Sequence, residues 1–210
     1  MGLMAATSER EMKIVGILGG VASGKSLVAE ELRKLGARVL DADQVGHQVL
    51  LEPEVIQAAR DRWGDAVITE AGQINRSEVA KIVFAQTPDG PKELSFLEQL
   101  THPRIGMRLR QEFEAIRAGG STKVVILDAP VMLKAGWDKY CDYILFIDVP
   151  RDMRLQRARV RGWTDRDFEA RESSQESLET KRAAANHVID NSGSIESTRQ
   201  QIERFWGSLD

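Results

Sequence analysis

One eight-residue stretch near the start of the chain, from Gly19 to Ser26, constrains the fold more than any other part. Its letters, GGVASGKS, match the phosphate-binding template G-x-x-x-x-G-K-[ST] at every fixed position. The apolar run 14–18 before it predicts a buried parallel strand, and the apolar spacing over 27–35 predicts a helix after it. This order of strand, tight loop and helix is the context that the template requires. The sequence therefore predicts an α/β fold with a nucleoside triphosphate bound at this loop.

The chemistry of the stretch follows from its residue types. Glycines let the backbone wrap an anion, so that successive N–H groups and a helix N-terminus face phosphate oxygens. Lys25 is expected to reach the β- and γ-phosphates, and the Ser26 hydroxyl to hold Mg²⁺. A glycine-rich turn can also simply join a strand to a helix, but the surrounding context argues against that interpretation. The residues assigned to the nucleotide are Gly19, Gly20, Val21, Ala22, Ser23, Gly24, Lys25, Ser26 and Leu27.

Composition limits the remaining classes. A chain of 210 residues has room for one α/β core and a smaller inserted region. A net charge of -3 argues against a nucleic-acid face, and no apolar run reaches the length of a membrane span. Residues 1–12 lack the apolar core of a signal peptide and are expected to form a short flexible extension. The single cysteine, Cys141, is compatible with a reducing compartment, so a cytoplasmic enzyme is expected; the oligomeric state stays open.

A second predicted strand, 37–40, ends in Asp41-Ala42-Asp43, and a helix is expected over 45–51. Ligands of open α/β sheets gather at the carboxyl ends of strands, so both carboxylates are expected near the phosphate loop and the substrate. Aspartate is also a common residue at the start of a helix, where it caps the first turn. Both interpretations can hold together, with one aspartate capping and its neighbour facing the substrate.

The segment that follows is far longer than one crossover connection needs. Its helical patterns predict helices at 53–63, 76–84 and 92–117, the last interrupted at Thr101-His102-Pro103. We expect an inserted, mostly helical substrate-binding region over about 46–118. The core is then expected to comprise 13–45, 119–150 and 187–210.

Three further strands are predicted at 124–127, 143–149 and 187–189, with a closing amphipathic helix over 195–209. The complete prediction is a three-layer α/β fold with a five-stranded parallel sheet. Asp128, at the end of the third strand, resembles the acid that organises Mg²⁺ in nucleotide hydrolases and kinases, or it is a turn former.

Seven arginines fall between Arg151 and Arg171. Arg154, Arg157 and Arg161 are spaced by three and four residues, which places them on one helical face. Guanidinium groups suit a transferring phosphoryl group, so a helical lid is predicted over about 151–180. A solvated face laced with acidic residues is the alternative.

The motifs together favour a small-molecule kinase. The Asn-Lys-x-Asp motif that switch GTPases use for guanine is missing from the sequence, and motor ATPases are usually larger. The phosphate loop, Asp41-Ala42-Asp43, the stretch Leu97-Glu98-Gln99-Leu100-Thr101-His102-Pro103 and the tail from Lys181 to Asn191 resemble the dephospho-CoA kinase family in this order. The resemblance covers about 13–193. It implies transfer of the γ-phosphoryl group of ATP, with Mg²⁺, to the ribose 3′-hydroxyl of dephospho-CoA.

The resemblance also implies residue roles. Asp43 orients or deprotonates the hydroxyl, and Asp41 supports Mg²⁺ or the ribose. Arg76 and His102 match the substrate region, although His-Pro can also mark only a helix break. The remaining assignments are Lys25, Arg157 and Arg161 as catalytic residues and Asn191 at the adenine. Gln175 and Lys181 match the Q-x-x-x-x-x-K pattern of the family.

Three positions depart from the family pattern. Leu27 stands where threonine is usual, Lys134 where an acid is usual, and Asn186 where aspartate is usual. None removes a residue assigned to chemistry, but the departures leave room for a different affinity or acceptor. The alternatives are a kinase of the same architecture acting on a nucleoside, nucleotide or shikimate-like acceptor, and a nucleotide-dependent regulatory protein without an acceptor.

Overall fold

A computed structural model describes residues 12–209, so the predicted extension 1–12 lies almost entirely outside the described residues. The described chain divides into two compact units. One comprises the residues up to Leu40 and those from Phe113 onward, and the other comprises Asp41–Glu112. These divisions differ from the limits 46–118 expected for the insertion.

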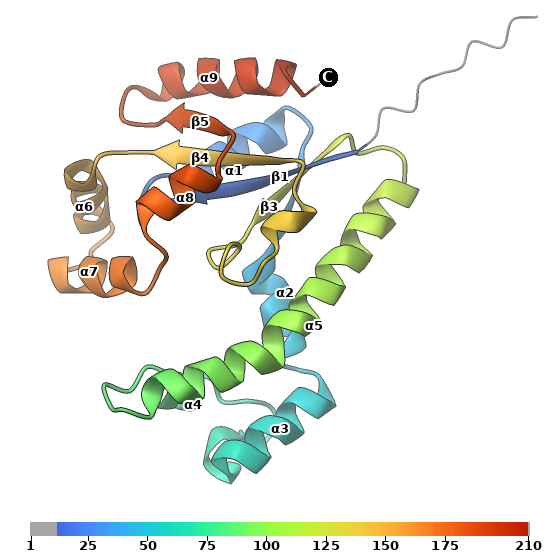
Figure 1. Cartoon of the computed structure of the whole chain (residues 1–210), viewed down its shortest axis with the longest axis vertical. Helices are drawn as coiled ribbons and strands as arrows, with labels where there is room; N and C mark the ends of the chain where they lie inside the picture. Colours follow the sequence, from blue (N-terminus) through green and yellow to red (C-terminus); the bar gives the residue numbers. More distant parts are fainter. Residues whose placement is uncertain (1–11, 210) are drawn as a thin grey trace, which may run out of the picture. The chain divides into compact units, whose positions relative to one another are not determined.

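The first unit is built on a five-stranded parallel sheet, which confirms the predicted fold class (Figure 1). Its strand order is β2-β3-β1-β4-β5. Strands β1 and β4 are parallel neighbours, and their pairing runs from Val15 opposite Tyr143 to Gly19 opposite Ile147. The strands are β1 Lys13–Gly19, β2 Arg38–Asp41, β3 Val124–Asp128, β4 Tyr143–Asp148 and β5 His187–Asp190. β1 and β3 are almost wholly buried, as expected for strands of a parallel sheet that is covered on both faces.

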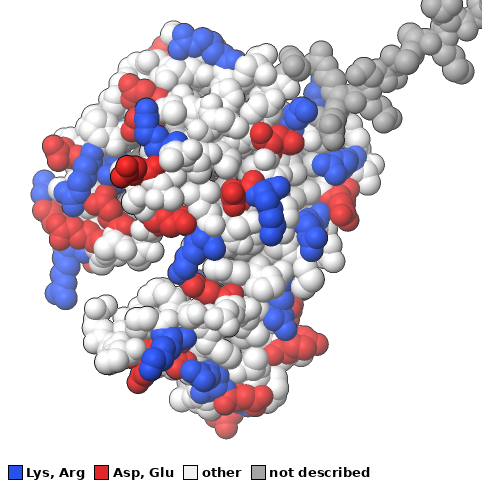
Figure 2. All heavy atoms as spheres, viewed as in Figure 1, with Lys and Arg blue, Asp and Glu red and all other residues white. Residues whose placement is uncertain are grey.

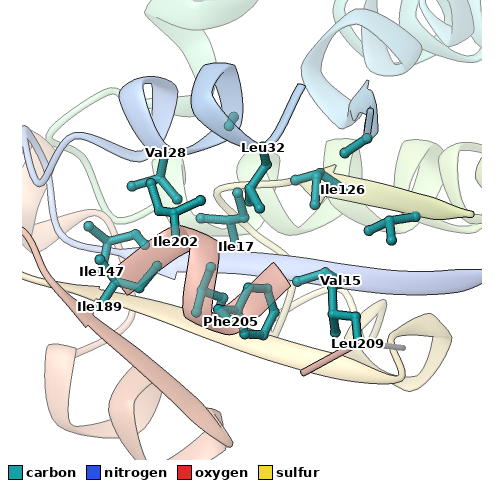
Figure 3. Close-up of a cluster of buried hydrophobic side chains, with 14 residues drawn as sticks. Val15, Ile17, Val28, Leu32, Ile126, Ile147, Ile189, Ile202, Phe205 and Leu209 are labelled. Carbon is teal, nitrogen blue, oxygen red and sulfur yellow. The ribbon is translucent and has the colours of Figure 1, made fainter. Parts of the chain in front are cut away.

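Helices α1 (Lys25–Lys34) and α9 (Ile195–Gly207) cover one face of this sheet. Val28 and Leu32 of α1 and Ile202 and Phe205 of α9 form one buried cluster with side chains of the strands (Figure 3). Successive residues of a strand point to opposite faces, so Val15 and Ile17 share this cluster. The sheet thus buries the apolar face of each helix, which is the source of most helix stability in proteins.

Gly16 marks the opposite face of β1. A Cβ atom added to Gly16 would lie 2.7 Å from the Met132 sulfur and 2.9 Å from the Cys141 sulfur. Phe113, near the end of helix α5 (Gly90–Ala118), packs edge-on against Tyr140 with ring centroids 6.3 Å apart. Helix α8 (Leu178–Ala184) also packs against β1 and β4. The sheet is therefore covered on both faces, which confirms the three-layer arrangement.

Three short helices follow β4 along the chain: α6 (Arg151–Val160), α7 (Asp165–Ser173) and α8. Figure 1 shows α6 following directly on β4. The turn between α6 and α7 passes through Gly162 at φ +81°, and the Thr164 hydroxyl and Asp167 carboxylate then form a reciprocal capping box. These local signals fix where α7 begins.

The second unit is helical, with α2 Ala42–Val49, α3 Pro53–Trp63, η1 Asp65–Val67, α4 Arg76–Val83 and most of α5 Gly90–Ala118. Glu93 connects α5 to the end of α3, because its carboxylate accepts hydrogen bonds from Nε and Nη2 of Arg62 and from Trp63 Nε1. Trp63 and Phe96 also meet edge to face at 5.4 Å. No described helix is long and apolar enough to span a bilayer.

The predicted break at Thr101-His102-Pro103 is wrong, because α5 continues through Pro103. Proline removes one N–H donor from the helix and leaves the carbonyl four residues earlier without its usual partner. Side chains add hydrogen bonds to neighbouring carbonyls of the helix: Thr101 Oγ1 donates to Leu97 O at 2.8 Å, and the Arg104 guanidinium donates to Leu100 O at 2.7 Å. The dipeptide His-Pro does not reveal these side-chain contacts.

Candidate functional site

The phosphate loop occupies the five residues between the end of β1 at Gly19 and the start of α1 at Lys25. It is tightly curled: the Ser23 N–H donates to Gly20 O at 3.2 Å, and Ala22 has φ +59°. No other non-glycine residue of the described chain has a positive φ. Backbone in such sparsely populated conformations persists only where its surroundings enforce it, and it gathers at ligand sites.

The start of α1 leaves its first N–H groups without side-chain partners. Its N-cap residue is Gly24, which forms no side-chain cap, and its first turn contains no acidic residue. Free N–H groups and the positive end of the helix dipole make this terminus suited to an anion. The geometry therefore agrees with the predicted phosphate site.

Lys25 points back over the beginning of the loop. Its Nζ donates to Gly19 O and Gly20 O, both at 3.3 Å. Burial lowers the pKa of Lys25, the Asp128 carboxylate opposes this, and the charges of Arg154 and Arg161 add to the lowering. Ser26, the next residue, is exposed. A partly desolvated ammonium surrounded by other cations is well placed to bind a phosphate, which would relieve that repulsion.

Gly24 and Asn191 are in close contact beneath the loop. A Cβ atom on Gly24 would lie 2.3 Å from Asn191 Nδ2, and Gly24 itself has φ +92°. The buried Asn191 amide donates to Ser23 O at 2.8 Å and accepts from Thr198 Oγ1 at 3.0 Å. The side chain predicted to meet adenine thus also supports the loop backbone.

Two arginines of α6 brace the same loop. Arg157 donates to Ser23 O at 3.4 Å and to Asn191 O at 2.7 Å. Arg154, which is 1 % exposed, donates to Val149 O, to Val21 O and, at 2.7 Å, to the Glu172 carboxylate. The sequence pattern places Arg154 in the predicted lid without a role, whereas the structure buries it against the phosphate loop. Its spacing of three residues from Arg157, directly after a strand, is the sequence signal that points to this position.

A cavity of about 450 Å³ opens beside the loop, within the first unit. Gly20 and Val21 line it, together with residues from the end of β4, α6, α7 and α8. Lys181 of α8 lines it as well, although the residue is only 2 % exposed. Its Nζ donates to Gln175 Oε1 at 2.7 Å. The structure therefore brings the two residues of the Q-x-x-x-x-x-K pattern together.

In the second unit, Asp41 caps α2. One of its carboxylate oxygens accepts from the Asp43 N–H at 2.8 Å and from the Gln44 N–H at 3.4 Å, which confirms the capping interpretation. The Asp43 side chain is left for another task. Desolvation raises the pKa of Asp43, the nearby Asp41 charge raises it further, and His47 and Arg76 oppose both effects.

The other residues predicted in this unit are Arg76 and His102. Arg76 is the first residue of α4 and lies near enough to Asp43 to act on its pKa. His102 lies inside α5 and is half-buried. Of the three departures from the family pattern, Asn186 keeps an acceptor where aspartate is usual, since its Oδ1 accepts from the Ile144 N–H at 2.9 Å.

Comparison with known proteins gives a consistent answer. A family model described as dephospho-CoA kinase matches residues 13–197. A dephospho-CoA kinase of Syntrophotalea carbinolica is 38% identical over 201 residues, covering 94% of this chain and 92% of that protein. One of Corynebacterium jeikeium is 34% identical, covering 94% of this chain and all of that protein.

Solved structures agree on the fold. A dephospho-CoA kinase from Campylobacter jejuni has a TM-score of 0.70 at 21% identity, covering 93% of this chain and 96% of that one. A shikimate kinase from Acinetobacter baumannii has a TM-score of 0.50 at 12% identity, covering 95% and 94%. Because the family model spans most of the sequence, and relatives above 30% identity align over nearly their whole length, the chain belongs to the dephospho-CoA kinase family.

Proposed function

We propose that this protein transfers the γ-phosphoryl group of ATP to the ribose 3′-hydroxyl of dephospho-CoA, giving CoA and ADP. The observation that carries the proposal is the curled loop Gly19–Ser26 with its inward-pointing lysine, in a chain of this family. Phosphoryl transfer needs little covalent help from a protein, because catalysis consists mainly of positioning and charge neutralisation.

The nucleotide half of the reaction is assigned to the first unit. Loop N–H groups and the start of α1 bind the phosphates, and Lys25 leaves the carbonyls of Gly19 and Gly20 to neutralise the γ-phosphate. Arg161 ends α6 and acts on the pKa of Lys25, so its charge reaches the same region. Arg157 and Asn191 hold Ser23, and the loop that contains Asn191 is proposed to receive adenine.

The residues present fit an Mg²⁺ ion bound mainly through ATP. No group of three or more His, Cys, Asp or Glu among the described residues could hold a metal alone, and Mg²⁺ in kinases usually keeps few protein ligands besides phosphates and water. The exposed Ser26 hydroxyl is proposed as one ligand, with the Asp128 carboxylate nearby in the sheet. When bound, the ion would neutralise phosphate charge.

The acceptor half is assigned to the second unit. As the bond between the γ-phosphorus and its bridging oxygen breaks, the ribose oxygen forms the new bond and its proton passes to the Asp43 carboxylate. The raised pKa of Asp43 makes that carboxylate a better proton acceptor than an ordinary aspartate. Asp41 fixes the start of α2 and supports the ribose, and Arg76 and His102 are proposed to bind the acceptor.

The decisive experiment measures ADP formation from ATP and Mg²⁺ with and without dephospho-CoA. We expect acceptor-dependent ADP, with the new phosphate on the ribose 3′-oxygen. The fold alone would also permit a kinase that acts on another acceptor. The same assay with nucleosides, nucleotides and shikimate distinguishes the two, because only a kinase with another acceptor would form ADP faster with one of these than with dephospho-CoA. ATP hydrolysis that ignores every acceptor would instead favour a regulatory protein and overturn the proposal.

ATP and dephospho-CoA are the proposed partners. Basic and acidic side chains are interspersed on the face seen in Figure 2, so this face offers no extended basic surface of the kind that binds nucleic acid. We further propose a substrate-binding insertion near 46–118, a lid near 151–180 and a cytoplasmic location, all of which still rest on the sequence.

A further inference from the structure

The most unusual buried group of the first unit is the ammonium of Lys181. Lysine is almost never fully buried without a charged partner, yet this residue is 2 % exposed. Within residues 12–209 its Nζ has one hydrogen-bond partner, the neutral amide of Gln175, and no carboxylate within ion-pair distance. An ammonium has three N–H donors, so the bond to Gln175 leaves donor capacity for another ligand.

The surroundings of Lys181 point to an anion as that ligand. Lys181 lines the same cavity as Gly20 and Val21. Lys25 Nζ bonds Gly20 O, and Arg154 Nη1 bonds Val21 O, so three cationic side chains meet at one corner of the phosphate loop. Of the acids lining this cavity, Glu172 pairs with Arg154, Asp148 pairs with Arg182, and Glu176 acts on the pKa of Lys181 without an ion pair to it in the described chain. Lys181 is thus the lining cation without an ion-pair partner among the described residues, and such a cation attracts a negatively charged ligand.

We propose that Lys181 contacts the γ-phosphoryl group of ATP as a second lysine beside Lys25, with Gln175 as the positioning residue that holds its ammonium. This inference rests on the proposed function and adds a catalytic residue to it. Lys181 keeps its proton throughout and neutralises charge on the equatorial phosphoryl oxygens. Gln175 suits the task because a neutral amide fixes the ammonium in place without cancelling its charge.

The protonation of Lys181 supplies a readout that a purely structural lysine would not give. Burial and the charges of Lys25 and Arg154, opposed by Glu176, lower the pKa of Lys181 to about 8. A phosphate bound to the ammonium favours the charged form, so ATP binding raises this pKa and takes up a proton. The charged groups facing this corner are Lys25, Asp148, Arg151, Arg154, Glu172 and Glu176.

The test compares the intact protein with Lys181→Met and Lys181→Arg. Binding of Mg·ATP is followed by calorimetry at pH 8 in buffers with different ionisation heats, which reports protons taken up. Because half of the Lys181 groups are charged at a pH equal to their pKa, we expect about 0.5 proton more for the wild type than for either variant. Lys34→Met, at the exposed far end of α1, is the matched control and should keep the wild-type uptake.

Turnover gives the second readout. We expect Lys181→Met to lower kcat by about 10²–10³-fold, the cost of losing one preorganised charge-stabilising group. Wild-type kcat should fall as the pH rises through the Lys181 pKa in the nucleotide complex. The kcat of Lys181→Arg should stay constant over this pH range because arginine stays charged. If Lys181→Met does not fold, Lys181→Arg decides the question.

Wild-type proton uptake in Lys181→Arg, or unchanged kcat in a folded Lys181→Met, would overturn the proposal. If the variants lose the proton uptake but ADP formation does not depend on dephospho-CoA, the contact between Lys181 and the nucleotide is supported and the proposed acceptor is wrong. The two proposals can therefore fail separately.

Discussion

Gly24 shows how one residue can matter to the loop for two separable reasons. It has φ +92°, and its Cα faces the Asn191 amide, which an added methyl group would meet at 2.3 Å. Gly36 has φ +109°, but nothing lies within 4 Å of the added atom.

Alanine at either position strains the backbone and should lower the free energy of unfolding by about 1–3 kcal/mol. Only Gly24→Ala should also displace Asn191 from Ser23 and weaken Mg·ATP binding. Thermal unfolding with and without Mg·ATP distinguishes these effects, and equal loss of nucleotide affinity in both variants would contradict the interpretation.

Asp43 and Asp41 differ in what their charges do. The proposed base must be ionised, so kcat/KM should fall as the pH drops through the raised pKa of Asp43. Asp41→Asn keeps an oxygen to cap α2 but removes the charge that raises this pKa, so the acid limb of the pH profile should move to lower pH. An unmoved limb would mean that the limb belongs to another group.

The stability effect of Asp43 has the opposite sign from its catalytic effect. An acid whose pKa is raised by folding binds more protons in the native state, so it makes the protein less stable as the pH rises above the unfolded value of about 3.9. Asp43→Asn should therefore reduce kcat by about 10²–10⁴-fold without lowering the melting temperature at pH 7. Melting curves and turnover of one preparation test both, and a large loss of stability would indicate a structural role.

At the scale of elements, Glu172 joins α7 to α6. Its carboxylate accepts from Arg154 Nη1 at 2.7 Å and from Arg151 Nε at 2.9 Å, and Arg154 is buried. Although burial raises the pKa of Glu172, these hydrogen bonds hold it below its usual value. The stabilisation is therefore present above the unfolded pKa of about 4.3 and is lost as the pH falls through the folded value. Glu172→Gln should cost about 1–3 kcal/mol, because it weakens a hydrogen bond to a buried charge.

The matched control for Glu172 is Asp165, which forms an exposed pair with Arg159. An exposed ion pair is worth less than about 1 kcal/mol, so Asp165→Asn should change denaturant unfolding little. Equal losses in the two variants would show that burial of Arg154 does not govern the strength of the α6–α7 contact.

For the whole molecule, the sequence predicted what local patterns encode. Apolar runs located all five strands, and the template located the phosphate loop, because each signal lies within about ten residues. Contacts between distant positions were not predictable: Arg154 and Val21 are 133 residues apart, and Asn191 and Ser23 are 168 apart. The sequence shows Lys181 only as part of a pattern, because its burial beside the loop depends on how α8 packs on the sheet.

The assignment of ATP to one unit and of the acceptor to the other predicts a division in hydrogen exchange. The nucleotide should slow exchange at amides of the loop 19–27 and around Asn191, all in the first unit. Dephospho-CoA should slow exchange within Asp41–Glu112, where Asp43, Arg76 and His102 lie. Ligand at 100 times its dissociation constant adds about 2.7 kcal/mol to stability, enough to slow exchange of amides that open globally by about 100-fold. Acceptor protection confined to the first unit would contradict the assignment of Asp43, Arg76 and His102, while leaving the phosphate loop as assigned.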